Sequence, residues 1–572
     1  MHHLRSVHGP TSERGSALAM SLLVLLMLSV LGLSLLSLSL NEVSITANWK
    51  DYTRAFYGAE AGVESSVANL RTLLAQNPDP ADSDLRAIAA PALNPYGGVT
   101  LAGLQVSHLL AAPPYAYNTQ MASGPYADLN GIVTDYQINV QATSNGGTRA
   151  NLNQTLQYIQ VPLFQFGVFY GRGVDLEIAP GPAMTFNGRV HANSNIYVGA
   201  GSTLRFDSYM TAAGHIYRQI KRDPDNPWGN NPQIKDKTGT YRDLNFDFDS
   251  NVGFGSNWTA DQWKAQAQST FQGTVKDGTM GVNEIIPPVP ELFYNPSNPD
   301  VVAHELVEMP QPSDSAQLRA AKLYSQAGLR IVNGAATDAY GNAVALPAGI
   351  LSSTSFYDKR EGKTVTVTQV DMGALRTSGV PLGNGLLYVT DTGGSDRVVR
   401  LVNGTQLPSG GLSVASPNPV YVQGDYNTIN KVPAAVMADA ITVLSNNWSA
   451  NNSDGKGTQV TTNRPASNTT VNAAFALGPS AESSLNNGNG QLENSIRFLE
   501  DWSGKSLNYA GSIVALWHSR QATGAWQPPG STGSAYYQAP NRNWAYDTLF
   551  NTQQPPGTPR GVIMARGRWT RG

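Results

Sequence analysis

The chain has 572 residues, which at about 100–200 residues per domain predicts several domains. Its 38 Lys and Arg residues against 41 Asp and Glu residues give a net charge of -3, so no nucleic-acid partner is expected. The absence of cysteine excludes disulfides, thiol catalysis and Cys-ligated metals. Only 14% of the residues are charged, while 56 are Gly and 35 are Pro. This composition favours short strands joined by many turns over helical bundles.

The N-terminus combines a polar leader with a long apolar segment. Residues 1–15 contain Arg5 and Arg14, and the 25 residues of the range 16–40 carry no charge. As a helix this segment spans about 37 Å, which is enough to cross a ~30 Å hydrocarbon layer. The preceding arginines favour a cytoplasmic start and an exported remainder. No small-residue cleavage site of the ordinary secretory kind follows Leu40.

The helix is predicted to continue beyond the apolar segment, over 16–75 in all. No proline occurs in it, and its second half carries an apolar stripe at helical spacing. Glu60 interrupts this stripe with a carboxylate, which either reaches water at the helix edge or pairs with a cation on a neighbouring subunit. A plain single-pass anchor does not need this continuation, whereas a subunit that packs by its helix into a filament does. The stripe consists of Phe56, Val63, Leu70, Val67 and Leu74.

The run ERG followed by SALAMSLLVLLMLSVLGLSLLSLSL, with AFYGAEAGVE further on, resembles the N-terminus of type IV pilin-like proteins. Within them it is most similar to the PilX-type minor pilins. The resemblance implies that a prepilin peptidase cuts between Gly15 and Ser16, which makes Ser16 the mature, usually N-methylated, first residue. It also implies association with other pilin subunits and with the inner-membrane pilus assembly machinery. The subunit would span the inner membrane once before assembly and reach the pilus or cell surface afterwards.

One position departs from the pattern of the major pilins. They carry a glutamate at the fifth mature position, which is Met20 in this chain. A carboxylate buried in lipid is costly unless it is paired. Methionine at this position therefore removes both the free-energy cost of burying a carboxylate and the ionic contact that the carboxylate would make. PilX-type minor pilins also lack this glutamate, and the departure therefore suits a minor or tip-associated subunit. Gly32 and its serine neighbours are expected to pack helix against helix in a filament.

Residues 76–163 are predicted to form a loop and a small pilin-like β section. Apolar residues alternate with polar ones on both sides of Asn145-Gly146-Gly147, which is typical of a β-hairpin. A long helix followed by a small antiparallel sheet is also the layout that the resemblance implies.

Residues 164–572 are predicted to form a β-rich domain, so the chain as a whole is expected to be α+β. Apolar residues two apart, the spacing of a strand, recur every 20 residues and later every 21. Such a repeat favours a parallel β-helix, with a β-sandwich as the alternative, and 218–385 is interpreted as insertions on one face. The columns are Phe164, Met184 and Leu204; Phe166, Phe186 and Phe206; Tyr170, Val190 and Met210; Leu176, Ile196 and Ile216; Val399, Val420 and Ile441; and Leu401, Val422 and Val443.

The last hundred residues are rich in aromatic side chains. Flat rings of this kind either form a platform that binds a sugar or a partner or cover the open end of the β stack. The residues concerned are Trp517, Trp526, Tyr536, Tyr537 and Trp544.

Motifs for catalysis and metal binding are incomplete in this sequence. The segment that begins at His304 lacks the second histidine of H-E-x-x-H. The acidic run from Asp243 to Asp249 lacks the glycine and glutamate of a calcium loop. His191 and His215 lie near the repeat columns but out of phase, and the charged residues of the repeat do not place two acids in one column. No catalytic residue, metal or cofactor is therefore expected.

The leading hypothesis is a non-enzymatic, PilX-like minor pilin that acts in pilus assembly or initiation and in adhesion at the filament tip. It leaves open whether the filament is a pilus or a secretion pseudopilus. The alternative is a membrane-anchored, surface-exposed β-helix protein that binds or cleaves carbohydrate.

Overall fold

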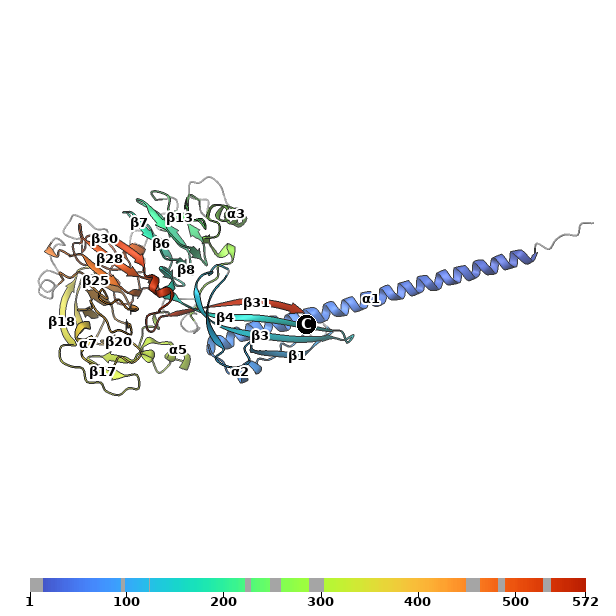
Figure 1. Cartoon of the computed structure of the whole chain (residues 1–572), viewed down its shortest axis with the longest axis horizontal. Coiled ribbons are helices and arrows are strands. Elements are labelled where there is room, and N and C mark those ends of the chain that lie inside the picture. The colour runs from blue at the N-terminus through green and yellow to red at the C-terminus, as the bar shows by residue number, and fades with distance from the viewer. Residues whose placement is uncertain are drawn as a thin grey trace, which may run out of the picture.

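The computed structural model describes residues 14–93, 98–122, 124–221, 228–246, 259–287, 303–448, 463–481, 489–527 and 536–571. It confirms the predicted α+β class: a long N-terminal helix, α1 (Arg14–Gln76), precedes a large strand-rich part with several sheets. Figure 1 shows α1 leaving a small sheet in one direction, while most of the strands lie at the other end of the long axis.

The small sheet, which packs against the second half of α1, is antiparallel. Its strands follow the order β1-β3-β4-β31, and β2 also pairs with β3. The turn between β3 and β4 contains Gly147 with φ +83, so the hairpin predicted around Asn145-Gly146-Gly147 is confirmed. We call α1 and this sheet the proximal module. Its strands are β1 (Val99–His108), β2 (Ala116–Gln120), β3 (Asn130–Ser144), β4 (Arg149–Pro162) and β31 (Arg560–Arg571).

Small residues let α1 approach the sheet closely. Ala55 and Ala59 are fully buried, and a Cβ atom added to Gly62 would lie only 2.7 Å from the Val140 side chain. The AFYGAEAGVE segment therefore has its small residues at the helix–sheet contact. One turn further, Val63 and its stripe partners fill the core between helix and sheet. The buried members of the stripe are Val63, Val67, Leu70 and Leu74.

The strand β31 changes the predicted division of the chain. The prediction assigned everything after residue 164 to the distal domain, but Arg560 pairs with Pro162 and β31 runs along β4. Arg566 of β31 also forms an ion pair with Glu64 of α1 through two contacts of 2.5 and 2.6 Å. Its hydrogen bond holds the pKa of the Glu64 carboxyl below the ordinary value. Residues 164–559, which we call the distal domain, are thus an insertion between two neighbouring strands of the proximal sheet.

The first part of the distal domain winds through three strands per turn, and each strand pairs in parallel with a strand of the next turn. Met184 pairs with Leu204 and Val190 with Met210, so the predicted spacing of 20 residues is confirmed there. The strands are β5 (Val168–Tyr170), β6 (Leu176–Ile178), β7 (Met184–Phe186), β8 (Val190–Ala192), β9 (Ile196–Val198), β10 (Leu204–Phe206), β11 (Met210–Ala212) and β12 (Ile216–Tyr217).

The register of the first turn differs from the prediction. Val168, not Tyr170, pairs with Val190, and Phe164 lies in a short 3-10 helix, η2 (Leu163–Gln165). The connection from β5 to β6 is two residues longer than its counterparts and contains Gly173 with φ +82. Because side chains alternate with period two, this shift keeps the same face of the strand inside.

A second set of parallel strands follows later in the chain. Val399, Val420 and Ile441 pair in register, as do Leu401, Val422 and Val443, so both predicted columns are confirmed. The strands of the two principal sheets in this set are β16 (Leu329–Val332), β19 (Lys363–Asp371), β20 (Leu386–Thr390), β21 (Arg397–Val402), β22 (Leu412–Ser416), β23 (Val420–Gln423), β24 (Ala434–Ala438), β25 (Ile441–Leu444), β27 (Ala474–Leu477) and β29 (Ile513–Ala515).

The two sets form one continuous stack. Ile513 of β29 pairs with Val168 of β5, so the last strand of the second set lies beside the first strand of the first set. The chain therefore enters the stack at β5 and leaves it at β29, and these two strands are neighbours near the middle of the stack. This explains how the domain fits between β4 and β31. The assignment of all of 164–572 to a parallel β-helix stays a prediction, because the domain also contains antiparallel strands and separate smaller sheets.

The stretch 218–385, interpreted from the sequence as insertions, contributes strands to the stack. β16 and β19 belong to its two principal sheets, and β13 (Gln233–Lys235) and β15 (Val275–Lys276) extend the first set. The sequence hid these strands because the connections between them vary in length. Other elements are α2 (Asp82–Arg86), α3 (Ala260–Phe271), α5 (Ala316–Ala321), α6 (Leu323–Gln326), α7 (Met372–Thr377), β18 (Leu351–Asp358), β26 (Thr469–Asn472), β28 (Ser506–Gly511) and β30 (Asn541–Tyr546).

Antiparallel hairpins form the edges of three sheets of the distal domain, and one of these hairpins is β18 against β19. β17 (Ala335–Asp338) pairs with β16, and β14 (Tyr241–Asp243) pairs with β13. Asn333 and Gly334, with φ of +50 and +83, form the turn between β16 and β17. In the β13–β14 turn, Asp236 accepts hydrogen bonds from the backbone N–H groups of Thr238 (2.8 Å) and Thr240 (3.0 Å). Asp338 accepts similar bonds from Tyr340 (2.8 Å) and Asn342 (2.9 Å) in the turn that follows β17. Closed edges of this kind protect stacked sheets from pairing with other chains.

Candidate functional site: the protruding helix and the buried ionic centres

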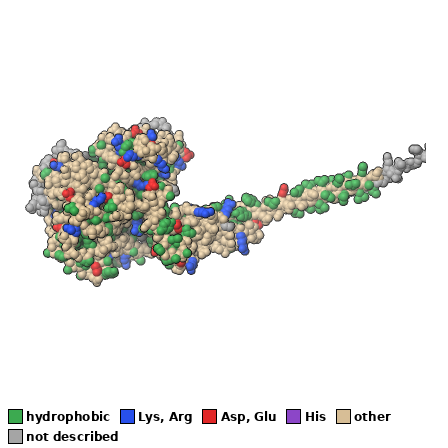
Figure 2. All heavy atoms as spheres, in the orientation of Figure 1, with side chains coloured by type: hydrophobic (Ala, Val, Ile, Leu, Met, Phe, Trp, Pro, Cys, Tyr) green, Lys and Arg blue, Asp and Glu red, His purple; other side chains and the backbone are tan. Residues whose placement is uncertain are grey.

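The first half of α1 has no covering protein. All described side chains from residue 16 to residue 50 are exposed, including Leu28 at 63% and Leu38 at 60%. The helix is long and apolar enough to cross a membrane, and its most apolar 18 residues have no buried member. Figure 2 shows the apolar side chains covering the protruding helix. So large a continuous apolar surface requires cover from lipid or from other protein.

The predicted packing residues lie on this bare segment. Met20 is 71% exposed, and a Cβ atom added to Gly32 would meet nothing within 4 Å, so the small size of Gly32 serves no contact within the chain. The Ser34 hydroxyl donates to the Val30 carbonyl at 2.8 Å, which satisfies it in an apolar environment. Gly15 and Ser16 lie in the first turn of α1.

Glu60 lies where α1 already contacts the sheet, and its side chain is exposed. This position agrees with the interpretation that Glu60 reaches water at the helix edge. Pairing with a cation of a neighbouring subunit stays a prediction.

A family model described as PilX N-terminal matches residues 14–64. The N-terminus is therefore a PilX-type, type IV pilin-like one. The match begins at Arg14 and ends at Glu64, the last residue of AFYGAEAGVE, whose small residues lie at the contact between α1 and the sheet. Searches of the curated proteins and of the solved structures gave no match. The PilX-type helix thus indicates association with a membrane and with pilus subunits, and the match does not extend to the distal domain.

The aromatic side chains predicted as a binding platform are largely internal. Trp517 is 0% exposed, and Tyr536 and Tyr537 are each 3% exposed, so the surface interpretation is wrong for these three. Trp526 and Trp544 are half-buried against the core that contains Tyr536 and Tyr537, whereas Trp517 belongs to a separate core. Trp526 donates to the Tyr537 hydroxyl at 2.9 Å, whereas the buried Trp544 Nε1 has no hydrogen-bond partner among the described residues. Large rings contribute more to the stability of the folded protein when they fill the stack than when they are exposed to water.

His304 lies in a buried ionic centre between two carboxylates. Its Nε2 lies 3.0 Å from Asp439 and its Nδ1 lies 3.0 Å from Glu308. Burial alone lowers the pKa of His304, but the hydrogen bonds to Asp439 and Glu308 outweigh it, so this pKa is raised. Ser519 also donates to Asp439. Serine and histidine thus share one carboxylate instead of contacting each other, and histidine does not activate the hydroxyl for nucleophilic attack.

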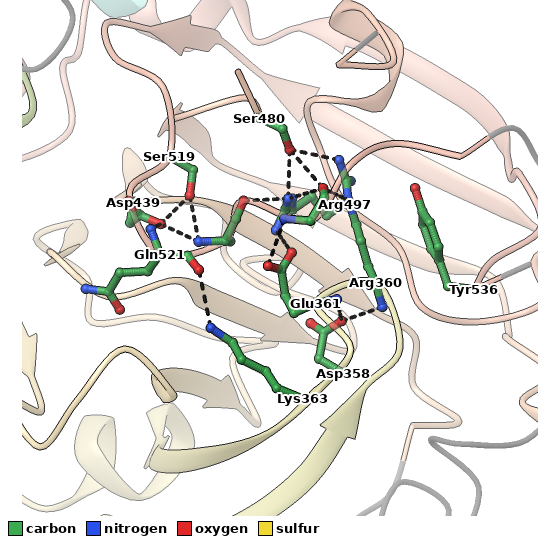
Figure 3. A network of polar contacts seen from close by, with 12 residues as sticks. Asp358, Arg360, Glu361, Lys363, Asp439, Ser480, Arg497, Ser519, Gln521 and Tyr536 are labelled. Atoms are coloured by element: carbon green, nitrogen blue, oxygen red, sulfur yellow. Dashed lines mark hydrogen bonds and ion pairs between the residues drawn. The ribbon is translucent and has the colours of Figure 1, made fainter. Parts of the chain in front are cut away.

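A second buried centre surrounds two arginines (Figure 3). Arg497 contacts Glu361 at 2.7 Å and donates to the Ser480 hydroxyl at 2.9 Å. Arg360 donates to the same hydroxyl at 3.1 Å, and burial lowers its pKa to about 10. Asp358 accepts a hydrogen bond from Tyr421 at 2.6 Å. These contacts tie the β18–β19 turn to the segment between β27 and β28, and Gly524 of the loop after β29 joins them by donating its N–H to Glu361.

The structure gives the predicted metal and acid candidates separate partners. No group of His, Cys, Asp and Glu residues suited to a metal occurs among the residues it describes. His191 contacts Thr211 at 2.8 Å, whereas His215 contacts Asp277 at 3.2 Å. Asp247 and Asp249 lie outside the described residues.

A cavity of about 1400 Å³ lies at the junction of the proximal module and the distal domain. Its described lining includes the end of α1, strand β2 and the side chains of Phe169 and Leu516. The lining contains many amide side chains and two arginines, Arg172 and Arg560, but among its described residues no Asp, Glu or His. The described part of the lining therefore contains no carboxylate or imidazole that could act as a general acid or base in hydrolysis.

Glu500 gives the distal domain a predictable dependence on pH. Its carboxylate is buried and accepts hydrogen bonds from the Ser445 backbone (2.6 Å) and hydroxyl (2.7 Å), yet burial raises its pKa from 4.5 to about 7. The folded state then binds the proton more tightly than the unfolded state. The resulting stabilisation is complete below pH 4.5 and is lost as pH rises through 7.

We expect Glu500→Gln to stabilise the distal domain at pH 8 relative to its effect at pH 5.5 by about 2 kcal/mol, because the linkage amounts to about 1.4 kcal/mol for each pH unit between pH 5.5 and the folded pKa of about 7 and vanishes above it. Urea unfolding followed by tryptophan fluorescence at both pH values measures this. The matched control is Asp261→Asn, because that carboxylate is 93% exposed. An unchanged pH profile in Glu500→Gln would contradict the prediction.

Proposed function

We propose that the protein is a non-enzymatic minor pilin-like subunit of a type IV pilus or a related secretion pseudopilus. It acts in filament assembly or initiation and presents its distal domain at the tip, where it contacts surfaces. The observation that carries this proposal is the apolar first half of α1, whose described side chains are exposed. This half is continuous with the second half, whose small residues pack closely against the proximal sheet. The PilX-type N-terminus supports it.

The assembly step follows from the exposed helix. A prepilin peptidase would cut between Gly15 and Ser16 and free the amine of Ser16. The apolar segment could then leave lipid for a bundle of similar helices from other pilin subunits, brought together by the inner-membrane assembly machinery. Gly32 allows close approach in such a bundle. With Met20 in place of a carboxylate, this helix needs no ionic partner inside the bundle.

Tip placement is supported by where the distal domain lies. Figure 1 shows it beyond the end of α1 that is opposite the apolar segment, along the axis of the molecule. In a filament of parallel helices, a subunit stacked ahead of this one would need the same space. A terminal position avoids that conflict.

The absence of enzymatic activity is part of the proposal. Two observations support it: Ser519 and His304 both contact Asp439, and the described lining of the junction cavity has no acid or base. A carbohydrate-active anchored protein remains the alternative, and turnover of any glycan by the purified chain would favour it.

Mass spectrometry of the mature N-terminus tests the proposal. In cells with the peptidase, we expect a chain that begins at N-methylated Ser16 and that is found in sheared filaments. In cells without the peptidase, or with Gly15→Val, the leader should stay attached and the filaments should lack the chain. An intact Met1 in normal cells, or a cut beyond Leu40, would contradict it.

A further inference from the structure

Three segments meet where α1 leaves the proximal sheet. They are α1 around Trp49–Tyr57, the β3–β4 turn around Gly146, and the last described residues of β31. Gly146 lies against α1 so closely that a Cβ atom there would collide with the Asp51 carboxylate. On the other side, the rings of Phe56 and Trp569 are 5.8 Å apart. The three segments therefore form a collar around the helix, and this collar is the part of the folded head nearest to the apolar segment.

The collar is rich in positive charge. We call its cations the basic rim: Lys50, Arg54, Arg149, Arg568 and Arg571. Each of the five is exposed. The acid within the collar, Asp51, lies 3.7 Å from Arg54. Of the other acids on this part of α1, Glu64 is paired with Arg566, while Glu42 lies on the bare helix and Glu60 lies one turn beyond the collar. Figure 2 shows Lys and Arg side chains gathered on the head beside α1.

Exposed aromatic rings accompany these cations. Trp49 is 69% exposed, Tyr57 is 62% exposed and Trp569 is 40% exposed. The Arg571 guanidinium lies over the rings of Phe56 and Trp569, 4.9 and 5.6 Å from their centroids. Aromatic and basic side chains concentrate together at the boundary between a membrane and water, where rings lie at the level of the headgroups.

The spacing along α1 brings the rim close to a membrane. Lys50 follows Leu40 by ten residues, or about 15 Å of helix. The apolar segment is longer than the roughly 20 residues that a bilayer needs, and exposed Val43 and Ile45 extend it, so the span can shift toward the head. Headgroups add about 5 Å or more on each side of the hydrocarbon core, and the field of an anionic surface extends for a Debye length of about 8 Å beyond.

We propose that the basic rim binds the headgroups of anionic phospholipids on the exported face of the membrane that α1 spans. This contact holds the head upright on the bilayer before assembly. The inference rests on the proposed function in one respect, the insertion of α1. Arginines that only protect the edge strand β31 from pairing would account for Arg568 and Arg571. They would not account for Lys50 and Arg149, which come from other elements.

Hydrogen exchange of the full chain in nanodiscs tests this inference. One nanodisc contains phosphatidylcholine alone, and the other also contains phosphatidylglycerol. We expect amide exchange in 145–149 and 568–571 to be about fivefold slower in the anionic nanodisc, because each basic residue near the surface contributes to binding. High salt should remove the difference, since screening shortens the reach of the charges.

Matched variants separate charge from structure. Arg149→Gln, Arg568→Gln and Arg571→Gln together should abolish the lipid dependence, and lysine at the same three positions should retain it. A control that neutralises exposed cations of the distal domain should leave it intact; these are Lys237, Arg376 and Lys505. Exchange in the buried β3 strand reports whether each variant is folded.

The outcomes are distinct. Equal exchange of the rim in both nanodiscs overturns the inference, and so does protection that depends on protein concentration but not on lipid, which would make the rim an interface for a neighbouring subunit. Exchange in 16–40 reports insertion separately. If that segment is unprotected in both nanodiscs, the proposal of membrane anchoring itself fails. If the segment is protected but the basic rim exchanges equally in both nanodiscs, only the proposed binding of lipid headgroups by the rim is refuted.

Discussion

Replacing residues 164–558 by Asn-Gly is expected to leave a folded proximal module that still carries its membrane helix. The ends to be joined already lie side by side, because the Leu163 N–H donates to the Pro559 carbonyl at 2.9 Å and Arg560 pairs with Pro162. Asn-Gly forms the two-residue turn that antiparallel neighbours require. The shortened protein should be cut after Gly15 and enter filaments, but lose whatever surface contact the distal domain makes.

Most of the contacts that hold this module together are its own, and Ile286 of the distal domain adds a bridge to Val562 of β31. The core between α1 and the sheet is retained, and so is the ion pair of Glu64 with Arg566. Excision removes distal cover from a few apolar residues, each contributing about 1.5–3 kcal/mol when fully buried, so the module should be less stable than in the full chain. The residues that lose cover are Tyr126, Leu129, Val133, Ile159 and Val161.

Circular dichroism and proteolysis of the excised protein measure this outcome. The matched control ends after residue 163 and so also lacks β31, which leaves β4 as an open edge and Glu64 without its arginine. We expect that control to lose cooperative unfolding. Failure of the Asn-Gly version itself to unfold cooperatively would show that the module depends on the distal domain.

Replacing Arg497 by methionine is expected to destabilise the distal domain by about 3–5 kcal/mol, the range found when one member of a buried ion pair is removed. Glu361 would keep its hydrogen bond from the Gly524 N–H, 2.9 Å long, but lose its charged partner at 2.7 Å. Ser480 would lose a donor as well. The uncompensated carboxylate, not the lost contact alone, accounts for the large effect.

Urea unfolding followed by tryptophan fluorescence measures this loss. The double variant Arg497→Met with Glu361→Gln should recover part of the stability, because it removes the unpaired charge. Exposed Arg376→Met is the control for the loss of a cation and should change stability by less than about 0.5 kcal/mol. A loss in Arg497→Met no larger than in this control would mean that water compensates Glu361 in the folded protein.

Much of the proximal module could be predicted from local patterns. The uncharged segment 16–40, the apolar stripe and the hairpin at Asn145-Gly146-Gly147 depend on residues that are neighbours in the chain. The repeat columns were also visible, because turns of equal length keep a constant spacing. The prediction failed where this spacing changes, as between β5 and β6, and where unequal connections separate the strands of 218–385.

The candidate site was predicted in part. The sequence placed Ser16, Met20 and Gly32 on the apolar helix and Gly15 at the end of the leader, and the described side chains of this apolar segment are exposed. The sequence did not separate internal from surface aromatic residues, because tryptophan and tyrosine such as Trp517 and Tyr537 occur both in buried cores and on binding surfaces. It singled out His304 only as part of an incomplete zinc motif. It gave no signal for Asp439 or for the centre around Arg497, because these partners lie more than a hundred residues away from His304 and Glu361 in the chain.

By itself, the sequence determined that a long apolar helix begins the chain and that short strands of regular spacing follow, since hydrophobic periodicity is a local property. Only the tertiary structure decided that the distal domain is an insertion, because the pairing of β31 with β4 depends on which strands meet in space. The same holds for the basic rim. Lys50, Arg149 and Arg571 are scattered in sequence, and they meet because the sheet brings a turn and a strand end to the point where α1 leaves it.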